Sequence, residues 1–419
     1  MEERLKKEIS RNRQIIKFSL YGFFKNLKFF EPYLYIYLIS CGINLFQIGI
    51  LISIREIVIN IFEIPSGLIS DFFGRKKELY LCFSFYIISF IFFYSGASFF
   101  IISTGMVFFG LGEAFRSGTH KAMIYSYLEQ KGWQEYKTFV YGKTRSMSLT
   151  GSAISAVSSV ILILCLPANR YIFLISTLPL ILDFILISTY PNSLDKCDIN
   201  HSKSNKELIK DSFTHLWKGR ILKKLIIGNG MFEASVNCTK SLIQPIIKAA
   251  VLSSGFIIIA KFNANDNVKI FLGLTYGLFY IISSFASKNA YKLKRWFSGE
   301  NILNGMYILL ASVLLILSFL INKPMLIILS FIFIFCFQNI RTPVYIDIIG
   351  SYMQKYERAT FLSVSSQIKS LLTVILAPFI GFIAEKMSLS YALTALAIIL
   401  LASFVFSELK SVLKEESKV

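Results

Sequence analysis

Charged residues are scarce in this chain. Asp, Glu, Lys and Arg make up only 16% of its 419 residues, whereas a soluble domain carries about a quarter. Acids are rarer than bases, 25 against 44, which leaves a formal net charge of +19. Hydrophobic residues make up 54% of the chain, and the mean hydropathy is +0.59. This composition excludes an ordinary soluble domain and predicts a polytopic membrane protein.

Cysteine and histidine are also few, with six and three copies. The cysteines are scattered at no spacing that a metal site or a disulfide framework would need. Cys41 and Cys165 both fall near the outer ends of expected helices, so a contact between these two stays open. We expect neither a metal site nor a cofactor.

The motifs of common catalytic and nucleotide-binding sites are missing too. The chain has no glycine loop followed by Lys-Ser/Thr, no His-Glu-x-x-His and no Gly-x-Ser-x-Gly. The sequence therefore predicts a protein that is not an enzyme, and transport energy would come from an ion or solute gradient. The positive charge does not indicate nucleic acid binding, because the bases lie in short loops between apolar runs.

Long apolar runs are what the chain has in abundance. A helix that spans a bilayer needs about 20 apolar residues, and segments of that kind follow one another along the chain. The first set covers 17–40, 46–69, 79–97, 99–125, 143–166 and 171–190, and the second covers 224–251, 268–288, 301–321, 324–350, 360–384 and 389–407. We predict an all-α integral membrane protein with twelve transmembrane helices.

The two sets of helices define five parts of the chain. These are an N-terminal segment, a six-helix half, a polar linker, a second six-helix half and a C-terminal tail, over 1–16, 17–190, 191–223, 224–407 and 408–419. A short amphipathic helix is expected around 207–217. Roughly thirty Lys and Arg lie on the side of the N-terminus and about five on the other, a bias that marks the cytoplasmic side. We therefore expect a multi-pass protein of the cell (plasma or inner) membrane, with both termini and the linker in the cytoplasm.

The two halves repeat each other in sequence. Arg116 aligns with Arg341, and Tyr127 aligns with Tyr352, each pair 225 positions apart. After a small gap, Thr138 lines up with Thr360. Parallel repeats related by an axis along the membrane normal account for such a similarity.

The loop between the second and third expected helices carries the most specific motif. It reads Gly67-Leu68-Ile69-Ser70-Asp71-Phe72-Phe73-Gly74-Arg75-Lys76-Lys77. This run resembles the signature G-x-L-x-D-x-x-G-R-K of the major facilitator superfamily at Gly67, Asp71, Gly74, Arg75 and Lys76. The resemblance implies two pseudo-symmetric six-helix halves and transport by alternating access. It also implies that Asp71 latches the halves on the inner side, at the N-terminus of helix eleven around 357–360.

Charges inside the expected helices are the candidate functional residues, because each costs roughly 2.5–3.5 kcal/mol on insertion scales. By the resemblance, helices one, four, seven and ten line the central cavity, and the charges fall mainly on these helices and their neighbours. Candidates for substrate binding are Lys25, Lys28, Glu31, Arg116, Lys240 and Arg341. Candidates for proton coupling are Glu56, Glu63, Glu113, His120 and Glu233.

The two arginines allow opposite interpretations. If both face the cavity, their planar guanidinium groups suit a carboxylate or phosphate. If acids neutralise the bases in pairs, the site suits a zwitterion instead. Alternatively Arg116 is locked to Glu113 and Arg341 to Asp347, and both arginines only brace helix packing.

Other candidates have structural alternatives as well. Lys28 and Glu31 could form a local i, i+3 ion pair, and His120 could be a packed, hydrogen-bonded residue. Gly118 and Gly151 are most simply explained as positions where helices approach closely.

The first hypothesis is a secondary transporter of a small polar or anionic solute, most simply a monomeric exporter, with exchange for protons as an option. Its partners would be the solute, the proton and the lipid bilayer, and not nucleic acid. The signature loop is similar to that of drug–proton antiporters, but Gly118 follows Arg116 by two residues and not four, and helix five lacks the Gly-Pro pair of that branch. The alternatives are an importer of an organic anion or metabolite, and a non-transporting relative that handles lipid or acts as a sensor.

Overall fold

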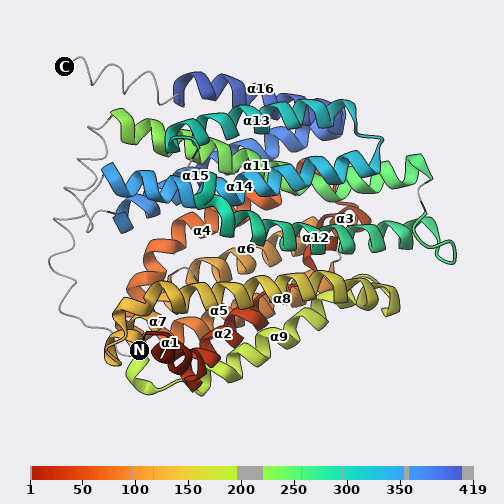
Figure 1. Ribbon diagram of the computed structural model, residues 1–419. Coiled ribbons are helices and arrows are strands. Elements are labelled where there is room, and N and C mark those ends of the chain that lie inside the picture. The colour runs from red at the N-terminus through yellow and green to blue at the C-terminus, as the bar shows by residue number, and fades with distance from the viewer. Residues whose placement is uncertain are drawn as a thin grey trace, which may run out of the picture. The chain divides into compact units, whose positions relative to one another are not determined.

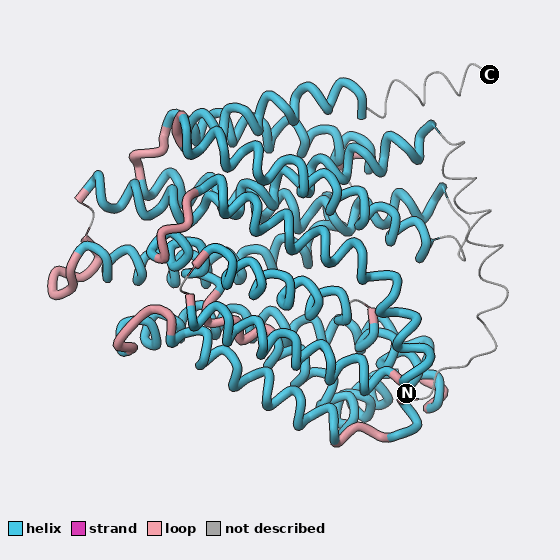
Figure 2. Tube along the Cα trace, turned by 180° about the vertical axis from the view of Figure 1, so that it is seen from behind, coloured by secondary structure: helices cyan, strands magenta, loops and turns pink. Residues whose placement is uncertain are grey.

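The computed structural model describes residues 2–96, 98–116, 118–195, 220–255, 257–293, 296–352 and 358–407. Within these ranges the regular structure is helical and no strand occurs (Figures 1 and 2). The fold is therefore all-α, as predicted. The amphipathic helix expected around 207–217 lies outside the described residues.

The helices follow the predicted spans closely. The part before the linker forms α1 (Glu2–Arg11), α2 (Arg13–Lys25), η1 (Glu31–Tyr33), α3 (Leu34–Ser40), α4 (Leu45–Phe73), α5 (Arg75–Ser95), α6 (Phe99–Arg116), α7 (Thr119–Gln130), η2 (Gln134–Tyr136), α8 (Lys137–Cys165), α9 (Tyr171–Ser188) and η3 (Asn192–Leu194). The part after it forms α11 (Arg220–Ser254), α12 (Ala264–Leu293), α13 (Gly299–Phe319), α14 (Pro324–Tyr352), α15 (Arg358–Lys386) and α16 (Leu389–Ser407). Each predicted span coincides with one helix or with two consecutive helices.

In the described part of the chain, 10 helical segments are long and apolar enough to cross a membrane. Two of the predicted spans, the first and the seventh, are not among these segments, and the structure explains why. The first span is broken into α2 and α3, each shorter than a bilayer requires. The seventh, α11, is 35 residues long but carries several charges along its length, Glu233 and Lys240 among them.

The prediction of a continuous first helix over 17–40 is wrong. α2 ends at Lys25, where the side-chain amide of Asn26 donates to the carbonyl oxygen of Gly22 at 2.7 Å. The chain becomes helical again at η1, with Pro32 among its first residues. Pro32 has no N–H with which a helix arriving from α2 could continue its hydrogen bonding, but it fits the first turn of a new helix. Lys28 therefore lies in a non-helical stretch and not on a helix face.

Helix four is broken as well, and the cause corrects the interpretation of Gly118. α6 ends at Arg116 and α7 begins at Thr119. Gly118 has a φ of +83°, and a Cβ placed on it would meet nothing within 4 Å. Its role is to supply left-handed backbone at the break, not to let helices approach.

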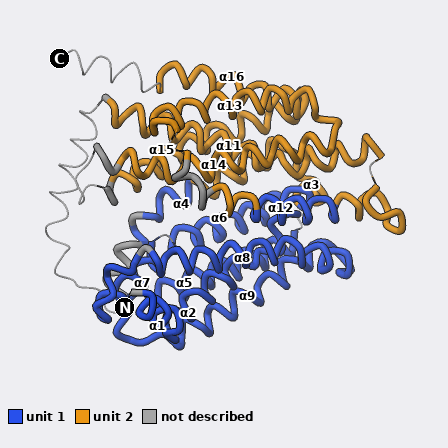
Figure 3. The backbone as a smooth tube through the Cα atoms, viewed as in Figure 1, with its two compact units in different colours: residues 1–37, 57–199, 269–281 blue, residues 38–56, 200–268, 282–419 orange. Residues whose placement is uncertain are grey.

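The chain divides into two compact units (Figure 3). Unit 1 contains residues 1–37, 57–199 and 269–281, and unit 2 contains 38–56, 200–268 and 282–419. The units follow the two sets of helices, with two exceptions: the end of α3 and α4 as far as Glu56 belong to unit 2, and one stretch of α12 belongs to unit 1.

In unit 1, α2 packs on α8 and α9, and α5 packs on α6 and α9 (Figure 1). Aromatic rings fill the space between these helices. Phe30 lies 4.9 Å from Phe90 and 5.8 Å from Phe173, measured between ring centroids. Gly151 of α8 faces the backbone of α2, where a Cβ would lie 2.5 Å from the carbonyl oxygen of Phe23. This contact confirms Gly151 as a close-packing position.

In unit 2, α11 packs on α14, α15 and α16, and α13 packs on α14 and α16. The first part of α4 lies against α15 in the same unit. Gly49 meets the backbone of Ala377 there, and the hydroxyl of Ser53 donates to the carbonyl oxygen of Val374 at 2.7 Å. Small and hydroxyl side chains thus hold two backbones close, as they do in other membrane proteins.

Two glycines of α8 provide a matched test of this packing. Gly151→Ala should force α2 away from α8 and destabilise the protein by about 1–3 kcal/mol, because the added methyl collides with backbone. Gly142→Ala adds the same methyl to the same helix in open space and should be neutral or stabilise by up to about 1 kcal/mol. Thermal unfolding of both variants in detergent checks this. Equal melting temperatures would contradict the close approach of α2 and α8.

Candidate functional site

Four of the charged candidates of unit 1 form one group, Lys25, Lys28, Glu113 and Arg116, which we call the α2–α6 cluster. Arg116 is the last residue of α6, and Glu113 lies one turn before it. Nη2 of Arg116 lies 2.7 Å from Oε2 of Glu113, and Nε donates to the same oxygen at 3.2 Å. The pairing of Arg116 with Glu113 that the sequence suggested is therefore present.

Lys28 joins this cluster because helix one is broken. Its ammonium nitrogen lies 3.7 Å from Oε1 of Glu113. Glu31 is instead hydrogen-bonded to the hydroxyl of Tyr280, so the local i, i+3 pair between Lys28 and Glu31 is wrong. The physical reason is the non-helical stretch between Lys25 and η1, which separates the two side chains.

Lys25 ends α2 and lies within electrostatic range of the other three members. Three bases, Lys25, Lys28 and Arg116, thus surround one acid, Glu113. A single carboxylate balances one of these charges, so the cluster carries an excess of positive charge.

A groove of about 220 Å³ in unit 1 borders this cluster. α2, α7 and α8 contribute most of its lining. The basic residues that line it are Lys25, Arg116, Lys121 and Arg145, and none of the described lining residues is an acid. Sequence reasoning missed Lys121 and Arg145 as site candidates. Their position just past the break in helix four and near the start of helix five was the signal that could have found them.

His120 lines the same groove but is firmly packed. Its ring stacks on Tyr21 with centroids 3.6 Å apart, and its Nε2 lies 3.2 Å from the hydroxyl of Tyr190. Phe18 contacts the ring edge-on. These contacts favour the structural alternative for His120.

The charges of unit 2 form a second group, Asn229, Glu233, Lys240, Gln338 and Arg341, which we call the α11–α14 cluster. The ammonium group of Lys240 donates to Oε1 of Gln338, and the amide of Gln338 donates to Oε2 of Glu233 at 2.6 Å. The side chain of Gln338 therefore bridges a base and an acid that both lie on α11.

Arg341 is only 4% exposed and has a different partner from the one expected. Its Nη1 donates to Oδ1 of Asn229 at 2.7 Å, and its guanidinium lies 4.3 Å from the ring centroid of Phe232. The expected pairing with Asp347 is wrong. Six residues along a helix of 3.6 residues per turn put Asp347 on another face of α14, where it is exposed.

The two clusters are related but not alike. The offset that pairs Arg116 with Arg341 also pairs Glu113 with Gln338. The acid beside the arginine is thus replaced by an amide in the second half. There α11 supplies the acid instead, through Glu233.

The remaining coupling candidates lie on α4. Glu56 is 5% exposed and accepts hydrogen bonds from Arg55 and from the hydroxyl of Ser370, both at 2.7 Å. Both of its oxygens are therefore occupied by donors. Glu63 lies two turns further along α4, within unit 1.

The bases of the signature loop are held within unit 1. Gly74 has a φ of +98°. Arg75 donates to the hydroxyl of Ser126 at 2.6 Å, and the ammonium of Lys76 donates to Oδ1 of Asn192 at 3.0 Å. The side chains of Asp71 and of residues 358–360, and residue 357 itself, lie outside the described part of the structure, so the latch stays a prediction.

Metal ligands do not gather in the described part of the chain, where no group of three or more His, Cys, Asp or Glu could hold an ion. Cys41 and Cys165 are free thiols.

The sequence matches the profile of the Major Facilitator Superfamily over residues 18–366. The chain therefore belongs to the Major Facilitator Superfamily, and the resemblance of its signature loop is confirmed. It is a multi-pass membrane protein with a transporter fold.

Known proteins agree with this assignment. An uncharacterised transporter of the same superfamily from Bacillus subtilis (strain 168), YxaM, is 33% identical over 95 residues, 23% of this chain and 24% of that protein. The match thus spans about a quarter of the curated relative. Among solved structures, the nucleoside transporter NupG has a TM-score of 0.76 at 13% identity and covers 94% of this chain and 99% of its own.

Two further solved structures have the same fold. A bacterial homologue of the human lysosomal transporter Spinster, solved in an inward-facing and occupied conformation, has a TM-score of 0.73 at 14% identity over 96% of this chain and 97% of its own. A D-xylose–proton symporter has a TM-score of 0.69 at 13% identity over 94% and 96%. At such identities the likeness shows the fold alone.

Asn229 offers a test of how Arg341 is held. Asn229→Leu should destabilise the protein by about 1.5–3 kcal/mol, because a buried guanidinium loses its acceptor. Asn339→Leu is the matched control, since the amide of Asn339 donates only to the carbonyl oxygen of Phe335 in its own helix. Thermal unfolding compares the two variants. A control that melts as early as Asn229→Leu would contradict the role of Asn229.

Proposed function

We propose that this protein is a secondary active transporter of a small anionic solute that works by alternating access. The observation that carries the proposal is the excess of positive charge in the α2–α6 cluster, beside a groove with four basic lining residues. Membership of the superfamily and the transporter fold support the transport role. The protein would not be an enzyme, and an ion or solute gradient would supply its energy.

Charge balance favours an anion over a zwitterion or a cation. The α2–α6 cluster has three bases and one acid, and the described lining of the groove adds two more bases and no acid. Arg116 has about a third of its side chain exposed, so its remaining N–H donors can reach a solute in the groove. A planar guanidinium of this kind suits a carboxylate or phosphate group.

Proton coupling belongs to this proposal. Of the predicted carriers, Glu113 and Glu56 are paired with bases, which favours their charged forms. Glu233 accepts from the amide of Gln338 and the hydroxyl of Thr342. Both of its described donors are therefore neutral.

Two directions of transport are proposed. Export is supported by the likeness of the signature loop to that of drug–proton antiporters. Uptake of an organic anion is the second candidate. It is favoured because Lys25 lies within electrostatic range of two acids, Glu113 and Asp183. In both cases we propose a monomer in the cell or inner membrane with both termini in the cytoplasm, an orientation supported by the side on which the bases gather.

Transport into proteoliposomes tests the proposal directly. The probes are radiolabelled succinate, citrate, benzoate and inorganic phosphate as anions, glycine as a zwitterion and choline as a cation. Uridine and xylose are the neutral probes, chosen because solved relatives are a nucleoside transporter and a xylose symporter. We expect protein-dependent transport of at least one anion. Transport of only neutral or cationic probes would contradict the proposal.

Arg116 should contribute directly to affinity for such an anion. Arg116→Lys keeps the charge but loses the planar fork, so the apparent KM should rise about tenfold, a loss of about 1.4 kcal/mol, with little change in thermal stability. Arg170→Lys is the matched control, because Arg170 lies between α8 and α9 and stacks on Tyr94. A loss of stability with an unchanged KM in Arg116→Lys would remove this arginine from the solute site.

A further inference from the structure

One acid of unit 1 belongs to neither cluster. Asp183 lies on α9, with 0% of its surface exposed. Neither of its carboxyl oxygens has a hydrogen-bond partner in the described part of the structure. Every other buried acid described above has at least one donor, so Asp183 requires a separate explanation.

The groups that face Asp183 are few. From α2 these are Lys25 and Tyr21, and beyond the end of α9 it is Tyr190. The titratable groups that α5 contributes to this region are Cys82, buried close to Tyr21, Tyr86, and Tyr80, whose ring packs on Phe184 next to Asp183. From α7, His120 stacks on Tyr21 and lies 3.2 Å from the hydroxyl of Tyr190. Lys25 is the one lysine or arginine of this set.

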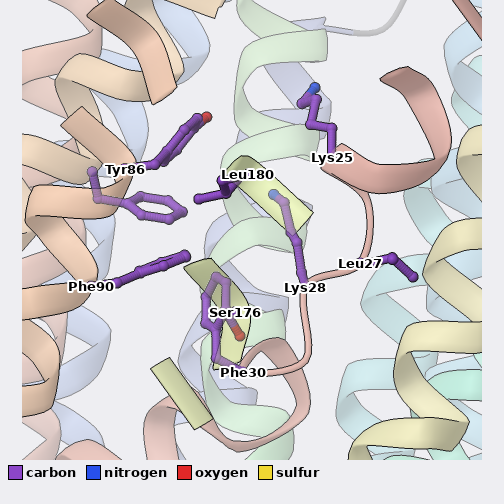
Figure 4. A pocket seen from close by; sticks show the side chains of 9 residues that line it. Lys25, Leu27, Lys28, Phe30, Tyr86, Phe90, Ser176 and Leu180 are labelled. Atoms are coloured by element: carbon purple, nitrogen blue, oxygen red, sulfur yellow. The ribbon is translucent and has the colours of Figure 1, made fainter. Parts of the chain in front are cut away.

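A small cavity lies beside this group of residues (Figure 4). Its volume is about 20 Å³, and Lys25 and Lys28 flank one side while Tyr86 and Phe90 flank the other. Ser176 and Leu180 line it from α9, and Asp183 follows Leu180 by one turn on the same helical face. Most of the lining is apolar, but Lys25, Lys28 and Ser176 bring polar atoms to it, and the volume is enough for one water molecule.

The burial of Asp183 restricts its charge. An ionised carboxylate with no donor is very unfavourable in a low-dielectric interior, whereas a neutral carboxyl is tolerated. If Asp183 does ionise, Lys25 is the cation that can balance it. Lys25 also lines the groove of unit 1, where an anionic solute would bind. The ammonium group of Lys25 can therefore balance either the carboxylate of Asp183 or an anionic solute in the groove.

We propose that Asp183 is a proton-binding site linked to solute binding through Lys25, an inference that rests on the proposed anion transport. When Asp183 releases its proton to a water molecule, Lys25 balances the carboxylate. When an anion in the groove draws Lys25 away, Asp183 takes a proton back from water. The O–H bond of the carboxyl group is the bond that breaks and forms, and the proton passes to and from water.

The sign of this linkage has a functional consequence. Anion and proton favour each other's binding: a bound anion draws Lys25 from the carboxylate of Asp183, and a bound proton removes the negative charge that competes with the anion for Lys25. The two would therefore cross the membrane in the same direction. An inward proton gradient would then drive uptake, the second direction proposed above.

Infrared spectroscopy of the full-length protein in lipid tests the proton site without a substrate. At neutral pH the wild-type protein should show a C=O stretching band from a protonated carboxyl group that is lost in Asp183→Asn. Thr177→Val, a change on the same helix away from the cavity, should keep the band. Identical spectra for wild type and Asp183→Asn would overturn the proposal, because the carboxyl would then hold no proton.

Transport of the anions named above tests the linkage. With the vesicle interior alkaline, the wild-type protein should accumulate the transported anion severalfold, and Asp183→Asn should lose accumulation while still exchanging the anion between the two sides. Asp183→Glu should restore part of the accumulation, and Thr177→Val should behave as wild type. Accumulation that persists in Asp183→Asn, or that needs an acidic interior, would overturn the linkage, and so would a loss seen in Glu233→Gln but not in Asp183→Asn.

The infrared and transport measurements distinguish a failure of the proposed function from a failure of the proposed role of Asp183. If the wild-type protein transports none of the anions, the proposed function fails, while the infrared band still decides whether Asp183 holds a proton. If anions are transported without any response to pH, anion transport stands and the role of Asp183 in coupling is overturned.

Discussion

The carboxylate of Glu113 is the interaction on which the rest of the account depends. It accepts from Arg116 at 2.7 Å and lies 3.7 Å from the ammonium of Lys28, and Lys25 is close by. A bilayer allows buried charges only when they are balanced or when a mobile charge can reach them. Because one acid cannot balance three bases, we propose that the remaining positive charge serves an anion in the groove and Asp183.

The α11–α14 cluster balances its buried charges in a different way. Arg341 is enclosed by Asn229 and the ring of Phe232, and Gln338 links Lys240 to Glu233. These donors and acceptors pair with one another, except that Nε of Arg341 has no hydrogen-bond partner in the described part of the structure. The arginines that the repeat makes equivalent thus lie in different surroundings: Arg116 borders a groove, whereas Arg341 is buried and donates to Asn229 of α11.

The sequence predicted the helices well because hydropathy and length alone decide which segments can cross a bilayer. It also placed Arg116 beside Glu113, which are one turn apart on a single helix. It could not predict contacts that depend on a broken helix, such as Lys28 with Glu113, or those that depend on which helix faces which, such as Arg341 with Asn229. Asp183 was visible as a lone acid in the sixth span, but its lack of partners became apparent only from the packing of α9 against α2 and α5.

Protection of a thiol in the groove tests the central claim most directly. Ser148 lines the groove and is close to a cysteine in size, so Ser148→Cys can be introduced after the six native cysteines are replaced. The account predicts that an anion transported by the protein slows alkylation of Cys at this position severalfold, whereas its uncharged amide analogue does not. An alkylation rate that the anion leaves unchanged, or that the neutral analogue slows equally, would contradict an anion site at the α2–α6 cluster.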